Sequence, residues 1–220
     1  MQERNAKQTD IVIDLHAGPD RTEELAEVMH CAFIEYTRKG ERSSAMLETP
    51  QSLREEMRGG THIGIATTRV GEAQDITGDS LAASADNRTA NCTGGPDSPE
   101  YCVDNRIHDC AADRTADRII AMVKYQDGGD GTLYFCRLAV LPEFRGRRIA
   151  GMLVRALRAE ALSAGFAGLS CTVRTQETGN IAMYEQLGMT VVSHGYVVSA
   201  TKIKRAVVHM RDADLTAAPR

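Results

Sequence analysis

The sequence predicts one α/β (α+β) domain, because strand-like and helix-like patterns alternate along its 220 residues. Residues 132–141 are apolar on both faces apart from Arg137, which is typical of a central strand covered on both sides. Residues 145–164 then carry apolar side chains at helical spacing and form the clearest amphipathic helix of the chain. The composition, with 42% hydrophobic and 25% charged residues, is that of an ordinary globular protein.

The first third of the chain is predicted to contain two strands and two helices. Its longer helix places Leu25, Met29 and Phe33 on one face. Asp20 is a suitable N-cap for that helix, and Thr49-Pro50 is a typical entry to the next one. The predicted elements are a strand, a helix, a second helix and a second strand at residues 11–15, 21–38, 49–57 and 62–70.

The C-terminal half is predicted to continue in the order β-β-α-β-α-β-β. Pro142 ends the central strand, and Gly165 and Gly188 end the two helices. The predicted strands cover residues 119–125, 132–141, 168–173, 189–194 and a part of 201–210, and the predicted helices cover residues 145–164 and 179–187.

Residues 71–117 differ in composition from the rest of the chain. They contain ten acidic and three basic side chains, a net charge of −7, whereas the whole chain carries −4, so the remaining residues carry +3. The segment is poor in apolar residues and cannot bury enough surface to offset the entropy lost on ordering. We therefore expect an acidic, disordered insertion within a single domain that spans residues 1–220. A small satellite element is the alternative, because loops of this length are uncommon.

The charge pattern and the cysteines bear on the cellular setting. A net charge of −4 gives no argument for nucleic-acid binding, and no apolar run approaches the ~18 residues of a membrane span. Residues 1–10 do not resemble a signal peptide, so we expect a cytoplasmic protein with reduced cysteines and no membrane partner. Cys92, Cys102, Cys110 and His108 invite a zinc interpretation, but they lack the close cysteine pairs of structural zinc sites, and we expect no metal.

The most informative segment is the turn between the central strand and the following helix. Gly146, Ala150 and Gly151 are small residues at a helix start, where unpaired N–H groups and the helix dipole attract anions. Positive charge is added by three arginines, Arg145, Arg147 and Arg148. The combination fits a pyrophosphate, although on spacing alone a basic helix start at the surface is equally compatible.

Two stretches together resemble the acyl-CoA binding signatures of the GNAT acyltransferase superfamily. Residues 145–150, Arg-Gly-Arg-Arg-Ile-Ala, are similar to the family motif Arg/Gln-x-x-Gly-x-Gly/Ala. Residues 179–189 are similar to its Asn-x-x-x-Tyr-x-x-x-Gly segment, with Asn180, Tyr184 and Gly188 at the three defined positions. Both stretches follow predicted strands in the family's order. The resemblance covers the C-terminal half well and the N-terminal half through element order alone.

The resemblance implies a mixed central sheet, splayed near its middle and flanked by helices, with the pantetheine of acetyl-CoA in the splay. It assigns pairing with the pantetheine to the backbone of Leu138, Ala139 and Val140, and it places Asn180 beside the cofactor. It assigns the pyrophosphate to the backbone N–H groups of Arg145, Gly146, Arg147, Arg148, Ile149, Ala150 and Gly151. The family has Gly where this chain has Arg148. Because a helical residue needs no positive φ, Arg148 can fit if its side chain turns outward. It could then add a contact to the phosphate, or it could crowd the pyrophosphate.

The resemblance also implies an enzyme that transfers an acetyl group from acetyl-CoA, as co-substrate, to an amine by direct attack. Tyr184 would protonate the leaving thiolate. No carboxylate lies within the central strand, so the general base is open: Glu35, Tyr36, Tyr134 and His194 are possible, as are a water or an amine that arrives neutral. A non-catalytic acyl-CoA-binding domain is the alternative. A homodimer would be unsurprising for the family, but the sequence indicates neither the oligomeric state nor the acceptor.

Overall fold

The computed structural model describes residues 10–38, 43–68, 117–198 and 204–213, which all belong to one compact unit. Within these residues seven strands form one sheet. They are β1 (Ile11–Asp14), β2 (His62–Thr68), β3 (Arg118–Asp127), β4 (Leu133–Val140), β5 (Leu169–Arg174), β6 (Met189–Val198) and β7 (Lys204–Asp212). The strand order is β1-β2-β3-β4-β5-β7-β6, and all neighbours are antiparallel except β4 and β5. The predicted mixed fold class is confirmed.

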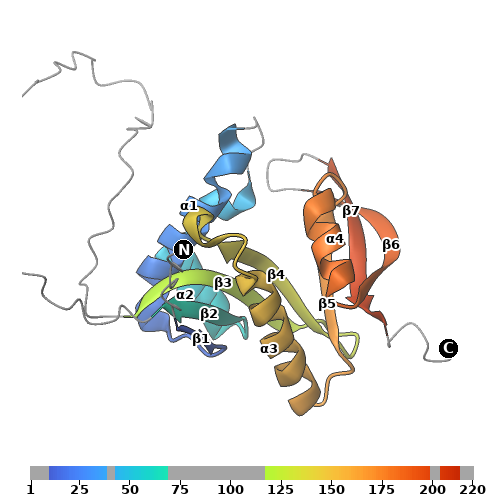
Figure 1. Ribbon diagram of the computed structural model, residues 1–220, viewed down its shortest axis with the longest axis horizontal. Coiled ribbons are helices and arrows are strands. Elements are labelled where there is room, and N and C mark those ends of the chain that lie inside the picture. Colours follow the sequence, from blue (N-terminus) through green and yellow to red (C-terminus); the bar gives the residue numbers. More distant parts are fainter. Residues whose placement is uncertain (1–9, 39–42, 69–116, 199–203, 214–220) are drawn as a thin grey trace, which may run out of the picture. The chain divides into compact units, whose positions relative to one another are not determined.

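Four α-helices cover the described part of the sheet: α1 (Thr22–Arg38), α2 (Pro50–Arg58), α3 (Ile149–Ser163) and α4 (Thr178–Gln186). Short 3-10 turns precede α1, α2 and α3 at Pro19–Arg21, Ser44–Leu47 and Pro142–Phe144. The entry to α2 is a capping box, because the Ser52 N–H donates to the Thr49 hydroxyl at 3.1 Å and the Thr49 N–H donates to the Ser52 hydroxyl at 2.9 Å. Figure 1 shows α3 on one face of the sheet and α1 and α2 on the other.

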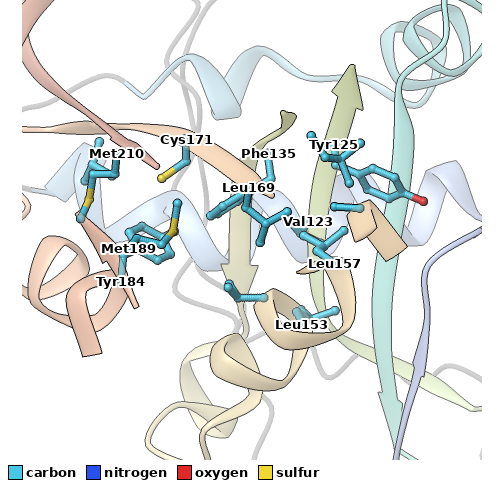
Figure 2. Close-up of a cluster of buried hydrophobic side chains, with 14 of the residues drawn as sticks. Val123, Tyr125, Phe135, Leu153, Leu157, Leu169, Cys171, Tyr184, Met189 and Met210 are labelled. Carbon is cyan, nitrogen blue, oxygen red and sulfur yellow. The ribbon is translucent and has the colours of Figure 1, made fainter. Parts of the chain in front are cut away.

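Each face of the sheet has its own hydrophobic cluster. On the α3 and α4 face, Leu153 and Leu157 pack with Phe135, Leu169 and further buried side chains; ten residues of this cluster, these four included, are labelled in Figure 2. On the α1 and α2 face, the buried residues include Leu25, Met29, Leu53, Ile63 and Ile65. Because both faces are covered, the middle strands read as nearly continuous apolar runs in the sequence.

The sheet opens between β4 and β5. The two strands pair only at Leu133↔Leu169, Tyr134↔Ser170 and Phe135↔Cys171, so the rest of β4 has no partner on that side. Figure 1 shows β4 and β5 close at one end and apart at the other. Beside this gap, the register between β3 and β4 shifts so that Val123 lies opposite two residues, Arg137 and Leu138. Arg137 has a φ of 52° at this bulge.

The structure corrects two boundaries of the prediction. The helix expected from Arg145 begins at Ile149, because Gly146 and Arg148 have positive φ values of 77° and 62°. Strand β6 continues to Val198 instead of ending at His194, because it pairs with β7 along its whole length. Except for Asp117, the predicted insertion at residues 71–117 lies outside the described residues. Its two flanks meet, since Thr68 at the end of β2 pairs with Arg118 at the start of β3.

Candidate active site

A cleft of about 760 Å³ lies at the gap between β4 and β5. Its walls come from the second half of β4, the turn that follows, the first turns of α3, the helix α4 and the C-terminal half of α1. All residues that the sequence assigned to the cofactor or to catalysis line this cleft, with the exception of Arg147. The fold therefore brings these segments together at one cleft, where the resemblance to the GNAT superfamily implies that the cofactor binds.

The turn before α3 has a backbone that favours glycine at two positions. Gly146 has a φ of 77°, which would strain any other residue even though an added Cβ would have no atom within 4 Å. Arg148 is the N-cap of α3 and has φ 62° and ψ 16°, the left-handed conformation. The expectation that Arg148 is an ordinary helical residue is therefore wrong. The family's glycine at this position is explained by the positive φ.

The first turn of α3 presents unpaired backbone donors to the cleft. The first N–H bonded within the helix is that of Met152, which donates to the Arg148 carbonyl at 3.0 Å. The N–H groups of Ile149, Ala150 and Gly151 precede it, and the Arg148 side chain does not cap them. Donors at a helix N-terminus, together with the helix dipole, form a binding site for an anion.

Arg155 is a cleft residue that the sequence analysis missed. A Cβ on Gly151 would lie 3.4 Å from the Arg155 Nη1, so the guanidinium extends back over the first turn of α3. Its spacing of four residues from Gly151 is the signal that could have found it, since residues four apart share a helix face. The glycine thus leaves room for both the anion and the guanidinium.

The arginines of the turn have different surroundings. Arg145 points toward α1, where its guanidinium donates to the Glu35 carboxylate at 2.8 Å and to the Ala32 carbonyl at 2.9 Å. The Arg147 guanidinium lies over the Phe144 ring, 5.0 Å from its centroid. The charge of Arg145 is therefore balanced by Glu35, and this pair ties the turn to α1. Arg148, which is exposed, lines the cleft together with Arg155.

Helix α4 brings Asn180 and Tyr184 to the cleft. Asn180 is exposed near the start of the helix, whereas Tyr184 is only 7% exposed. The Tyr184 ring meets the Phe135 ring edge to face, with the centroids 5.5 Å apart, and Figure 2 shows it within the buried cluster. The helix ends at Gln186, so Gly188, which has a φ of 86°, terminates it instead of sharing its face.

Comparison with known proteins agrees with this geometry. Residues 84–189 match the model of the acetyltransferase (GNAT) family. The chain carries a GNAT acetyltransferase domain over these residues. It is accordingly an acyltransferase, and the resemblance seen in the sequence is confirmed. No curated protein sequence matches the chain at a significant level.

Solved GNAT structures share the fold at low sequence identity. A putative acetyltransferase from Acinetobacter baylyi superposes with a TM-score of 0.59 at 10% identity, covering 97% of this chain and 98% of that one. An acetyltransferase of the GNAT family from Streptococcus pneumoniae has a TM-score of 0.56 at 11% identity, with coverages of 92% and 98%. The paia N-acetyltransferase from Thermoplasma acidophilum, solved in complex with coenzyme A, has a TM-score of 0.54 at 13% identity, with coverages of 92% and 98%.

The bases considered for this GNAT protein have distinct positions. Glu35 lines the cleft but is held by Arg145. Burial raises the pKa of Tyr134, which lowers the fraction of phenolate that could accept a proton. His194 pairs with Val208, whose side chain belongs to the α3 and α4 face of the sheet. The side chain of Tyr36 lies outside the described residues.

Two further findings concern the described residues alone. They contain no group of three or more His, Cys, Asp or Glu side chains that could hold a metal ion. The cysteines and the histidine considered for zinc lie outside the described ranges, between residues 92 and 110. No described helix is both long enough and apolar enough to cross a membrane.

Proposed function

We propose that this acyltransferase binds acetyl-CoA in the gap between β4 and β5 and transfers the acetyl group to an amine. The observation that carries the proposal is the gap itself, which begins directly beyond the Phe135↔Cys171 pair and leads to the uncapped N-terminus of α3. Its cleft volume of about 760 Å³ lies within the usual range for a site that holds a cofactor. The Thermoplasma structure, which was solved with coenzyme A, supports the assignment.

The pantetheine arm is expected to lie along β4. Leu138, Ala139 and Val140 line the cleft and have no partner on β5, so that edge of the strand offers backbone donors and acceptors. Polar backbone groups at such an edge are stabilised when another chain of amides pairs with them. The pantetheine contains two amides and can act as the missing strand.

The pyrophosphate is expected at the N-terminus of α3. The N–H groups of residues 149–151 supply donors, and the helix dipole favours negative charge there. Arg148 and Arg155 line the cleft near this turn and add charge that is not committed to α1, in contrast to Arg145. Asn180, at the start of α4, faces the same cleft and is proposed to contact the cofactor.

Tyr184 is proposed as the general acid. When the amine attacks the thioester carbonyl, a tetrahedral intermediate forms, and its collapse expels the thiolate of CoA. A phenol can donate a proton to that sulfur without a change of charge before the reaction. The contact with Phe135 fixes the Tyr184 ring beside the last pair between β4 and β5, where the cleft begins.

Cofactor binding is tested with a matched pair of glycine variants. Gly146→Asp places a carboxylate at the positive-φ turn beside the pyrophosphate, and it should abolish the rise in melting temperature that acetyl-CoA causes by mass action. Gly165→Asp is the control, because Gly165 also has a positive φ, 84°, and open space around it, but it follows the far end of α3. Equal acetyl-CoA affinity in the two variants would contradict the proposed site.

The acid is tested with a matched pair of tyrosine variants. Tyr184→Phe removes only a hydroxyl, and loss of a general acid typically lowers the rate by ~10²–10⁴-fold. We expect kcat to fall at least ~10-fold at saturating acetyl-CoA with the affinity for acetyl-CoA retained. Tyr125→Phe is the control, because Tyr125 is buried in the same cluster but bonds the Leu15 carbonyl. Thiol release is measured with ethanolamine, tyramine, spermidine and a peptide with a free N-terminus as acceptors.

A further inference from the structure

A row of polar side chains crosses β4, β5 and β7 on the face opposite Tyr184. Cys136 shows that this is the face covered by α2. It pairs with Lys124, and the Lys124 ammonium contacts Glu48 and Glu56 of the α2 region. Tyr134 lies two residues before Cys136 on β4 and therefore shares this face. The register Tyr134↔Ser170 then places Thr172 on it, and the pair Thr172↔His209 adds the histidine of β7.

Two members of this row, Thr172 and His209, are hydrogen-bonded to each other. The Thr172 hydroxyl lies 3.1 Å from the Nδ1 of His209. Tyr134 lies on the same face, diagonally across from Thr172. The His209 ring is accommodated by Gly195 of β6, because a Cβ there would lie 3.1 Å from the His209 Nε2. The ring is therefore oriented from both sides, by a hydroxyl on β5 and by a glycine on β6.

The row lies at the closed end of the gap. Phe135↔Cys171 is the last pair between β4 and β5, so Thr172 is the first residue of β5 beyond it. Tyr184 packs on Phe135 from the α4 side, and Thr172 belongs to the α2 side. A thioester in the gap would therefore have the phenol of Tyr184 on one face of the sheet and the hydroxyl of Thr172 on the other.

We propose that Thr172 and His209 remove the proton from the acceptor amine, which rests on the acetyl transfer proposed above. An alkylammonium bound at Thr172 gives a proton to the Thr172 oxygen, while the Thr172 hydroxyl proton passes to the Nδ1 of His209. The neutral amine attacks the acetyl carbon, and the C–S bond breaks as Tyr184 protonates the sulfur. The acetylated nitrogen then loses its second proton to solvent, and solvent returns a proton to the Tyr184 phenolate. The imidazolium of His209 also gives its proton to water.

Two carboxylates of the α1 and α2 side, Glu35 and Glu48, are engaged elsewhere. Glu35 is paired with Arg145. Glu48 receives the Lys124 ammonium at 3.2 Å and the Ser52 hydroxyl at 3.1 Å. The Nδ1 of His209, in contrast, lies 3.1 Å from the Thr172 hydroxyl and can accept a proton from it.

The groups that face His209 include two cations and one phenol. On the shared face, Arg174 of β5 lies diagonally across from it, and Arg211 lies two residues along β7. Tyr134 of β4 is the titratable neighbour beyond Thr172. From β6 the register brings Ser193 and Gly195, which do not titrate. Arg211 is itself paired with a carboxylate, since its Nη2 lies 3.3 Å from Asp130.

The test compares pH profiles of kcat/KM for the amine in the full chain. His209→Asn keeps a polar group at the position of Nδ1 but cannot store a proton. The acceptors are the four amines used above, and His194→Gln, on the opposite face of β6, is the control. In the wild type, kcat/KM should be flat between about pH 8 and pH 9, because bound ammonium is the substrate. In His209→Asn it should rise about tenfold per pH unit with ethanolamine, tyramine and spermidine, following the neutral amine in solution, whereas the peptide N-terminus, with a pKa of about 8, is already largely neutral and serves only for the comparison of rates.

Two threonine variants separate proton transfer from folding. Thr172→Val removes the hydroxyl with little change in shape and should reproduce the His209→Asn profile, whereas Thr172→Ser should restore the wild-type profile. The affinity for acetyl-CoA and the melting temperature of Thr172→Ser should match the wild type. A wild-type profile that itself rises tenfold per pH unit, or variants that leave the profile flat, would overturn the inference. A wild type that acetylates none of the four amines would instead contradict the proposed function.

Discussion

Arg148 is predicted to destabilise the protein relative to glycine. Its φ of 62° costs a non-glycine residue about 1–2 kcal/mol. A glycine would gain back only part of this, because its greater freedom in the unfolded chain costs about 0.4–1 kcal/mol. The Arg148 side chain is exposed and makes no cap bond to α3, so little else is lost on its removal. Arg148→Gly should therefore raise the free energy of unfolding by about 1 kcal/mol.

The assay is thermal unfolding of Arg148→Gly beside Arg148→Ala. For a chain of this size, 1 kcal/mol corresponds to about 2–4 °C in melting temperature. Arg148→Ala removes the same charge but keeps a Cβ at the positive φ, so it should remain close to the wild type. Both variants lose the same cation near the proposed pyrophosphate site, so they should change the acetyl-CoA affinity equally while differing in stability. An alanine variant that is as stable as the glycine variant would refute the argument from backbone conformation.

Three more outcomes follow from the structure. Asp212→Ala should lower the free energy of unfolding by about 3 kcal/mol, measured as a fall of about 6–12 °C in melting temperature. Asp212 is only 8% exposed, and it accepts two hydrogen bonds from the Arg158 guanidinium, at 2.6 and 2.9 Å, and one from the Leu169 N–H at 3.0 Å. Replacing residues 72–116 with a short Gly-Ser linker should leave a folded protein with unchanged acetyl-CoA binding, since Thr68 and Arg118 are already paired; an insoluble product would show that the segment is part of the core. Iodoacetamide at pH 8 should label exposed Cys31 before Cys171 in peptide maps, because burial raises the pKa of Cys171 to about 12 and leaves little thiolate to react.

The element order was predictable because each element has a local signal. The periodic apolar stripe of α3 and the apolar run of β4, which only Arg137 interrupts, are patterns that burial alone requires. The start of α3 was not predictable in the same way. Arg145, Arg147 and Arg148 are all good helix formers, and only the family's glycine at the position of Arg148 hinted at a positive φ. The arginines before Ile149 favour a helix by composition. The backbone instead forms a turn with positive φ at Gly146 and Arg148, and this turn brings the N–H groups of α3 to the cleft.

The candidate base depended on strand order, which the local pattern does not contain. In sequence β6 follows β5, and neighbouring elements of a chain are usually neighbours in space, so His194 was a reasonable candidate. In the sheet β7 lies between them, since β6 and β7 form an antiparallel pair and it is β7 that adds to β5. This arrangement places His209 directly opposite Thr172, 37 residues away in sequence. It leaves His194 at the edge of the sheet, paired with Val208 and facing the other side. The position of β7 thus determines which histidine lies beside Thr172 and is the candidate base. The pH profiles of His209→Asn and His194→Gln test this assignment directly.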